Sequence, residues 1–325
     1  MRYKKLGNSD IDVSVVALGA WAIGGDSNWG ASDDDMSIRT IHEAHDLGIT
    51  LLDTAPAYGL GHSEEVVGKA LKGRRSDFVL STKCGLVWDG GEGSVLMSRD
   101  GVTLLRNLSA KSVRKQLDES LKRLQTDYID IYITHWQATE PFLVPIEETM
   151  GVLNELVKEG KILGIGISNV TADQIDEYSK FGKIALIQQK YSMLDRTHEA
   201  TLMPKCKEHG ITFQAYSPLE RGILTGKVRM DTEVVGQAKD KIMWYQPEHR
   251  ARLLAVLDSF KPICDKYDCT MTNLAIAWTA AQMDNMNVLC GARKVDQVAD
   301  NAKGGDIVLD QVDIDTMNAA VAAIL

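Results

Sequence analysis

The chain has 325 residues, of which 44% are hydrophobic and 25% charged, as in a globular protein with one large or two average domains. Its 36 Lys and Arg against 45 Asp and Glu give a formal net charge of −9, which argues against a nucleic-acid partner. The five cysteines form no CxxC pair, so we expect no metal site and no disulfide framework. No apolar run would span a bilayer and no apolar signal region opens the chain, so we expect a cytoplasmic protein without membrane contact.

Strand signals begin at the N-terminus. The first fifteen residues carry a turn at Gly7-Asn8-Ser9-Asp10 between two short alternating runs, which predicts a β-hairpin. Eight continuous apolar runs follow, and such runs are typical of strands buried on both faces of a parallel sheet. The predicted strands are residues 16–19, 49–54, 78–83, 129–135, 163–169, 185–191, 211–217 and 287–291.

Amphipathic segments separate the predicted strands. Helical spacing of apolar residues predicts helices, one of which opens at a capping box between Thr171 and Gln174, and another starts near Lys294. The remaining predicted helices are residues 37–47, 109–124, 146–157, 270–283 and 313–325. Residues 85–108 include Gly90, Gly91 and Gly93 among polar residues and are expected to form a long loop with a functional or mobile character.

The alternation of strands and helices predicts a parallel α/β fold with right-handed crossovers. Eight units are the number that closes a barrel, whereas an open dinucleotide-binding sheet would place GxGxxG after its first strand, and Gly19, Gly24 and Gly25 do not fit that motif. The expected fold is therefore a (β/α)8 TIM barrel with an N-terminal β-hairpin and extra C-terminal helices, as a single domain over residues 1–325.

Polar residues at the strand ends form a coherent chemical group, because a barrel of this kind places its chemistry where the strands end. Lys83 at the end of a buried strand needs a counter-charge, and Asp53 on the adjacent strand supplies one. Tyr58 lies just beyond Asp53, where the Lys83 charge would lower the pKa of the phenol and make it a general acid. His135 can donate a hydrogen bond to the same carbonyl oxygen.

Each of these residues alone would more often be structural, Asp53 and Lys83 as an ion pair and His135 as a satisfied polar group. Together on one rim they favour hydride-transfer chemistry on a carbonyl or alcohol.

The chain resembles the aldo-keto reductases over essentially its whole length, and that resemblance implies a catalytic tetrad of these four residues. The motifs that carry it are Leu52-Asp53-Thr54-Ala55 with Tyr58-Gly59, Ser81-Thr82-Lys83, His135-Trp136, Gly160-Lys161-Ile162, Ser168-Asn169, Ser217-Pro218-Leu219 and Gly291-Ala292-Arg293.

A narrower resemblance, to the bacterial branch of general-stress and methylglyoxal reductases, rests on residues 21–25 and 134–137. The family resemblance also implies which residues bind a nicotinamide dinucleotide. Asn169 and Gln189 would hold the carboxamide and Tyr216 would stack on the nicotinamide ring. Ser168 is a further implied cofactor-binding residue. The remaining ones are Ser217, Leu219, Gly222 and Leu224 near the pyrophosphate, and Gly291, Arg293, Gln297 and Asn301 at the adenosine end.

Arg293 and Lys294 could pair with a 2′-phosphate, which favours NADP(H), although Arg293 could equally stack on adenine and leave NAD(H) possible. Trp21, Trp88 and Trp136 are the candidate substrate-pocket walls, which suit small aldehydes, dicarbonyls such as methylglyoxal, or sugars. Each tryptophan could also be core filler. We expect a reductase of such carbonyls, with two alternatives: a sugar or polyol dehydrogenase that runs in the oxidative direction, and a nucleotide-sensing regulatory subunit.

Overall fold

The computed structural model describes residues 1–25, 27, 29–233 and 242–325. Eight parallel strands close into a barrel in which each strand pairs with its two neighbours. This arrangement confirms the predicted TIM barrel, and all eight predicted strands are present. The barrel strands are β3 (Val16–Gly19), β4 (Leu51–Asp53), β5 (Val79–Cys84), β9 (Ile129–Thr134), β10 (Ile162–Ser168), β11 (Leu186–Lys190), β12 (Thr212–Tyr216) and β13 (Met286–Gly291).

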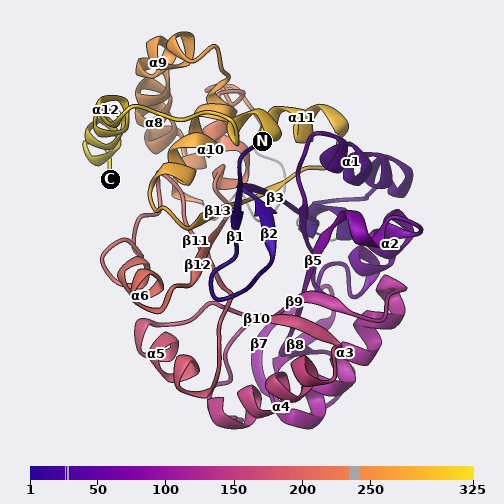
Figure 1. Cartoon of the computed structure of the whole chain (residues 1–325). Helices are drawn as coiled ribbons and strands as arrows, with labels where there is room; N and C mark the ends of the chain where they lie inside the picture. Colours follow the sequence, from indigo (N-terminus) through magenta and orange to yellow (C-terminus); the bar gives the residue numbers. More distant parts are fainter. Residues whose placement is uncertain (26, 28, 234–241) are drawn as a thin grey trace.

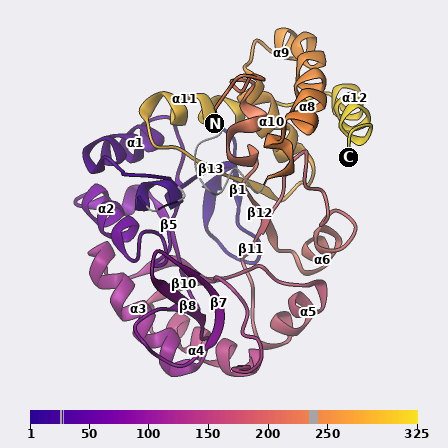
Figure 2. The same ribbon diagram turned by 180° about the vertical axis from the view of Figure 1, so that it is seen from behind.

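Helices surround the barrel, and three further helices extend it on one side (Figures 1 and 2). The capping box at Thr171 and Gln174 opens its helix as predicted. The outer ring contains α1 (Asp34–Asp46), α2 (His62–Leu71), α3 (Ala110–Leu124), α4 (Ile146–Lys158), α5 (Ala172–Phe181), α6 (Leu202–His209), α10 (Met271–Ala281) and α11 (Val295–Gly304). The helices on the side of α10 are α8 (Pro247–Ser259), α9 (Lys261–Lys266) and α12 (Gln311–Ala322).

The predicted N-terminal hairpin closes one end of the barrel. Its strands, β1 (Tyr3–Lys5) and β2 (Asp12–Ser14), lie across the end that faces the viewer in Figure 1. Leu6 and Val13 are fully buried and join Ile131, Ile133 and Leu186 of the barrel strands in an interior apolar cluster. The hairpin therefore seals the floor of the barrel with hydrophobic side chains and leaves the opposite rim for chemistry.

The segment at residues 85–108 contains a small antiparallel sheet, so the expectation of one long loop is wrong. β6 (Leu86–Val87), β8 (Val102–Arg106) and β7 (Ser94–Arg99) pair in that order, on the rim side of the barrel seen in Figure 2. The strands β7 and β8 are joined by Asp100 and Gly101, whose φ angles are +52° and +77°. Positive φ at both central residues suits a two-residue hairpin turn, and Asp-Gly between β-forming runs is the sequence signal for it.

The described residues contain no helix that combines the length and the apolar character needed to cross a membrane. Short 3₁₀ turns occupy several connections between elements: Trp21–Gly24 after β3, Arg75–Asp77 before β5, Glu220–Thr225 after β12, and Met243–Tyr245 before α8.

Candidate active site

The four residues singled out at the strand ends meet at one rim of the barrel. Asp53 is the last residue of β4, Lys83 lies next to the end of β5, and His135 follows β9 directly. Tyr58 lies in the connection between β4 and α2. Because parallel strands all end on the same side, neighbouring strands bring these side chains within reach of one another.

Asp53 and Lys83 form a fully buried ion pair. Lys83 Nζ lies 2.6 Å from Asp53 Oδ1 and donates a second hydrogen bond of 2.8 Å to the carbonyl of Thr54. The other carboxylate oxygen, Asp53 Oδ2, accepts hydrogen bonds from Ser81 Oγ at 2.8 Å and Gln188 Nε2 at 3.0 Å. Burial lowers the pKa of Lys83, and the negative charge of Asp53 opposes that effect. The two buried charges therefore offset each other.

Tyr58 lies above this pair and beside the histidine. Lys83 Nζ is 4.9 Å from the centroid of the Tyr58 ring, and the Tyr58 and His135 rings meet edge to face with centroids 5.8 Å apart. The pKa of Tyr58 is raised well above its ordinary value, first by withdrawal of the phenol from water and then by the Asp53 charge. The sequence-based argument that Lys83 would lower this pKa is therefore wrong, because Asp53 neutralises the lysine.

His135 is held in its neutral form. Burial and the nearby Lys83 charge lower the pKa of His135 well below its ordinary value. Its backbone is fixed on both sides, since the His135 N–H donates to Cys84 O and its carbonyl accepts from Asn169 Nδ2 at 2.8 Å. A neutral imidazole beside a protonated phenol gives this rim two donors that a carbonyl oxygen could accept from.

The residues expected to hold the nicotinamide lie on adjoining strands. Ser168 ends β10, Asn169 follows it, Gln189 lies in β11 and Tyr216 ends β12. Tyr216 donates from its hydroxyl to Asn169 Oδ1 at 3.0 Å, and Asn169 Nδ2 also lies 3.1 Å from Ser168 Oγ. Gln189 Nε2 donates to Val170 O at 2.7 Å. The structure therefore assembles this group as a connected patch of amides and an aromatic ring.

The connection after β12 has an unusual backbone. Ser217, Glu220, Arg221 and Gly222 all have positive φ, at +57°, +44°, +57° and +102°. Three non-glycine residues in this region indicate local strain of the kind found at functional sites. Leu219 is partly buried, but Leu224 is fully buried in the core. The Leu224 side chain therefore cannot contact a ligand, although the family resemblance placed Leu224 near the pyrophosphate.

The expected adenosine end lies where β13 leads into α11. Arg293 N–H donates to Gln297 Oε1 at 2.8 Å, and Asn301 Nδ2 donates to Gly291 O at 3.2 Å. The Arg293 guanidinium donates to Trp29 O at 2.7 Å and also to Ala31 O. Two backbone carbonyls of the segment after β3 therefore already bind the Arg293 guanidinium. The sequence had suggested that this guanidinium would pair with a 2′-phosphate.

The groups along this rim fit a dinucleotide. Gly291 is exposed, and an added Cβ there would meet no atom closer than 4.0 Å, so the backbone is open to close approach. The N-cap residue of α11, Lys294, makes no side-chain hydrogen bond to the first turn, which leaves its N–H groups for an anion. The amide patch at Asn169 and Gln189 lies at the other end of the same rim.

The candidate pocket walls differ in how they contact the tetrad. Trp21 lies 6.2 Å from Tyr58 between ring centroids, and Trp29 packs edge-on against Trp21 at 5.3 Å. Trp88 and Trp136 follow β6 and His135 and are partly exposed. Within the described ranges, neither makes a ring contact with Tyr58, so only Trp21 of the three candidate walls is placed against the Tyr58 ring.

Sequence reasoning missed two residues near the site. The Arg221 guanidinium lies over the Trp21 ring, 5.2 Å from its centroid, whereas the sequence indicated only Lys83 as a cation near Tyr58. Gln188 contacts Asp53 from the opposite side of the barrel. Neither residue carries a local sequence signal, because strand register and a left-handed backbone decide where each side chain lies.

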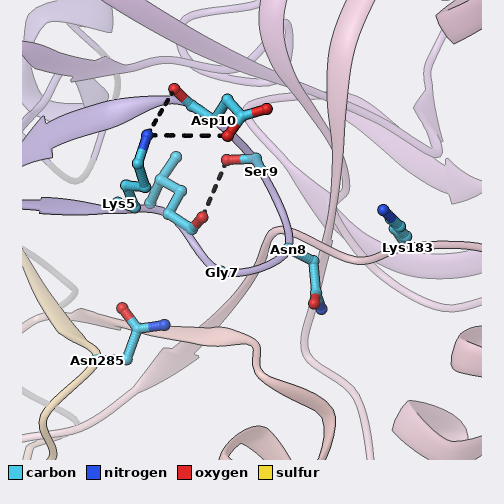
Figure 3. Close-up of a pocket in the computed structure, with 8 residues that line it drawn as sticks. Lys5, Gly7, Asn8, Ser9, Asp10, Lys183 and Asn285 are labelled. Atoms are coloured by element: carbon cyan, nitrogen blue, oxygen red, sulfur yellow. Dashed lines mark hydrogen bonds and ion pairs between the residues drawn. The ribbon is translucent and has the colours of Figure 1, made fainter.

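A cavity of about 440 Å³ lies at the other end of the molecule, beside the hairpin turn (Figure 3). Its lining includes Lys5, Asn8, Asp10, Lys183 and Asn285, and Figure 3 shows Lys5 bonded to Asp10. None of the rim residues lines it. This cavity therefore lies apart from the candidate site, which the convergence of titratable groups locates at the rim.

The sequence is similar to a known protein family over most of its length. The model of the Aldo/keto reductase family matches residues 15–322. The chain is 45% identical to the NADH-specific methylglyoxal reductase of Escherichia coli (strain K12), covering 100% of this chain and 99% of that protein. It is 39% identical to the aldo-keto reductase YhdN of Bacillus subtilis (strain 168), covering 92% and 87% of the two chains.

A solved structure shares the same fold. The glycerol dehydrogenase AKR11B4 from Gluconobacter oxydans superposes with a TM-score of 0.89 at 33% identity, covering 99% of this chain and 96% of the other. The sequence resemblance found at the strand ends is thereby confirmed over the whole barrel. This chain belongs to the aldo/keto reductase family and is an NAD(P)-dependent oxidoreductase.

Proposed function

We propose that this protein reduces small aldehydes and dicarbonyls, methylglyoxal first among them, to alcohols, with Tyr58 as the general acid. The observation that carries the proposal is the Tyr58 phenol lying between the Lys83–Asp53 pair and the neutral His135. The name of the Escherichia coli relative supports the choice of substrate.

We also propose that residues 1–325 act as one domain. The five free cysteines support a cytoplasmic location.

The reaction requires a hydride on the carbonyl carbon and a proton on its oxygen. A bound nicotinamide dinucleotide supplies the hydride. Tyr58 donates the proton, since its raised pKa keeps the phenol protonated at neutral pH. His135 donates a ring N–H to the same oxygen and stabilises the charge that develops there. The Lys83 ammonium, 4.9 Å from the Tyr58 ring centroid, stabilises the phenolate left after proton transfer.

The dinucleotide would lie along the rim from Tyr216 to α11. In this proposal Asn169 and Gln189 hold the carboxamide, Tyr216 stacks on the nicotinamide, and Ser168 orients Asn169. Backbone groups around Ser217, Leu219, Gly222 and Leu224 face the pyrophosphate. Gly291, Arg293, Gln297 and Asn301 form the adenosine end, with the α11 N-terminus as a source of N–H donors.

The sequence favoured NADP(H) because Arg293 could pair with a 2′-phosphate. The bonds from Arg293 to Trp29 O and Ala31 O weaken that argument, since two backbone carbonyls already occupy its guanidinium. We therefore propose that the protein accepts NADH at least as well as NADPH, in line with the name of its Escherichia coli relative. Titration with each reduced dinucleotide tests this point, and a Kd for NADPH tenfold below that for NADH would contradict it.

Arg221 favours a dicarbonyl over a simple aldehyde. Its guanidinium lies 5.2 Å from the centroid of the Trp21 ring, and that ring lies 6.2 Å from the Tyr58 ring between centroids, so one aromatic ring separates this cation from the Tyr58 ring. The second oxygen of a dicarbonyl would accept a hydrogen bond from this guanidinium. Arg221→Met should raise KM for methylglyoxal about tenfold or more, in line with the roughly 1.5–3 kcal/mol of a hydrogen bond to a charged group, and leave KM for propanal nearly unchanged.

The direct test is consumption of NADH and NADPH by the purified protein with methylglyoxal, propanal and a sugar aldehyde. Steady turnover of methylglyoxal is expected, and faster oxidation of glycerol than reduction of any carbonyl would favour the dehydrogenase alternative, which the glycerol dehydrogenase structure supports. Tight dinucleotide binding without turnover in either direction would instead favour a regulatory subunit.

A further inference from the structure

A line of buried amides crosses the barrel interior behind Asp53. Gln188, Gln214 and Asn287 belong to the neighbouring strands β11, β12 and β13 and are 3%, 0% and 0% exposed. Gln188 Nε2 donates to Gln214 Oε1 at 2.6 Å, and Gln214 Nε2 donates to Asn287 Oδ1 at 2.8 Å. Asn287 Nδ2 donates to the carbonyl of Ser14 at 2.9 Å. We call Gln188, Gln214 and Asn287 the amide chain.

The barrel floor sets the direction of every bond in the amide chain. The carbonyls of Ser14 and Val15 can only accept, so Asn287 must turn its NH₂ group toward them. Its oxygen then faces Gln214 and accepts from that amide, and the oxygen of Gln214 in turn accepts from Gln188. Gln188 therefore presents an NH₂ group, whose two hydrogens go to Gln214 and to Asp53.

This direction matters for the ion pair. Asp53 Oδ2 takes donors from Ser81 and from Gln188, which leaves Oδ1 facing Lys83. Donors on both oxygens prevent the carboxylate from rotating, and they hold the Lys83 ammonium at its place below the Tyr58 ring. Burial of an amide costs free energy unless its polar atoms are hydrogen-bonded, whereas apolar side chains in the same three positions would need no partners.

We propose that Gln188, backed by Gln214 and Asn287, is a positioning residue for the reaction, holding Asp53 so that Lys83 stays beneath Tyr58. This inference rests on the proposed function. Gln188 acts through Asp53 and touches neither substrate nor dinucleotide in this arrangement. The amide chain thereby connects the polar carbonyls of the barrel floor to the catalytic rim.

The test is steady-state kinetics of Gln188→Met with methylglyoxal and NADH. Methionine keeps the length of the side chain and removes the donor, so kcat should fall about tenfold to a hundredfold, as misplaced catalytic groups do. KM and the Kd for NADH should stay within about twofold, since binding groups are untouched. Gln214→Met, one bond further away, should lower kcat by a smaller factor, and it serves as the test if Gln188→Met does not fold.

Thr212→Val is the matched control. Thr212 is fully buried in the same strand as Gln214, accepts from Gly7 N and donates to Asn285, and makes no bond to the amide chain. This substitution also removes a buried hydrogen-bonding group from the barrel, so it should lower the melting temperature and leave kcat unchanged. If Gln188→Met lowers the melting temperature in the same way and leaves kcat unchanged, the inference is overturned.

A double-mutant cycle separates positioning from other effects. In an Asp53→Asn background the fall in kcat caused by Gln188→Met should largely vanish, because the group through which it acts is already altered. Fully multiplicative effects would contradict the inference. The proposed function fails separately, through a Tyr58→Phe variant that still reduces methylglyoxal; if that variant is inactive while Gln188→Met is fully active, only the inference about the amide chain is lost.

Discussion

Charges of opposite sign surround the phenol of Tyr58. Asp53 disfavours the phenolate and Lys83 favours it, and the 2.6 Å contact between the two leaves little net field. Withdrawal from water then decides the direction, so the pKa of Tyr58 rises. Protonated Tyr58 and neutral His135 are the forms that the proposed reduction requires, and the shifts in their pKa values favour both forms at neutral pH.

Removal of the Tyr58 hydroxyl should abolish reduction and spare binding. Tyr58→Phe keeps the ring between Trp21 and His135 but removes the proton donor, so kcat for methylglyoxal should fall about 10²- to 10⁴-fold. The Kd for NADH, followed by its fluorescence, should change little. Tyr3→Phe on the barrel floor removes a hydroxyl that donates to Gly48 O, remote from the rim, and is the control. An unchanged rate in Tyr58→Phe would show that another group donates the proton.

The pH dependence of reduction should follow the same charges. Because the pKa of Tyr58 lies well above 10 and that of His135 well below 6.5, kcat/KM should stay level between these values. Asp53→Asn removes the negative charge that disfavours the phenolate and leaves Lys83 unopposed, so the alkaline loss of activity should begin at a lower pH. Profiles of kcat/KM at saturating NADH measure this, and coincident alkaline limbs in the two proteins would contradict the assignment.

Individual helices differ in how tightly they pack against their neighbours. Gly68 of α2 lies so close to α3 that an added Cβ would come within 2.5 Å of Arg123 O, whereas Gly151 of α4 faces open space. The two positions look alike in sequence, each a glycine inside an amphipathic helix. Only the packing of α2 on α3 separates them.

These two glycines make a matched pair for a stability test. Gly151→Ala should stabilise the protein by about 0.5–1 kcal/mol, because alanine loses less backbone entropy in a helix. Gly68→Ala should destabilise it by about 1–3 kcal/mol, because the methyl group collides with backbone. Urea unfolding of both variants measures the difference, and a destabilised Gly151→Ala would be inconsistent with the open space seen beside α4.

At the scale of the whole molecule, the two ends of the barrel have separate tasks. The hairpin end contributes apolar side chains to the interior cluster, and the rim holds the titratable groups. Such separation is usual for this fold, in which one face serves stability and the other chemistry. The amide chain is the feature that runs between the two ends.

Leu6→Ala should lower stability without lowering catalytic rate. Leu6 is fully buried at the floor, so its truncation should cost about 2–5 kcal/mol and lower the melting temperature. Leu143, which is 62% exposed, provides the control, since Leu143→Ala should change stability by no more than about 0.5 kcal/mol. Below the melting transition kcat for methylglyoxal should be unchanged in both variants. A selective fall in kcat for Leu6→Ala would show that the floor also controls the rim.

The apolar runs determined the barrel strands to within two residues at each end, because strands buried on both faces must be continuously hydrophobic. The polar residues that close those runs likewise predicted which side chains would meet at the rim. Asp100-Gly101 is also the sequence signal for the β7–β8 hairpin, whereas Gly90, Gly91 and Gly93 among polar residues favour the loop that was expected there.

The tertiary structure alone decided features that depend on what lies across the barrel. The contact of Gln188 with Asp53 joins residues 135 positions apart, and the place of Arg221 over Trp21 follows from a left-handed backbone that no local motif announces. The direction of the Tyr58 pKa shift likewise depends on burial of the phenol and on the Asp53 charge, which come together only in the folded barrel. Composition and periodicity record which residues are buried, whereas distances between remote side chains arise only when the barrel closes.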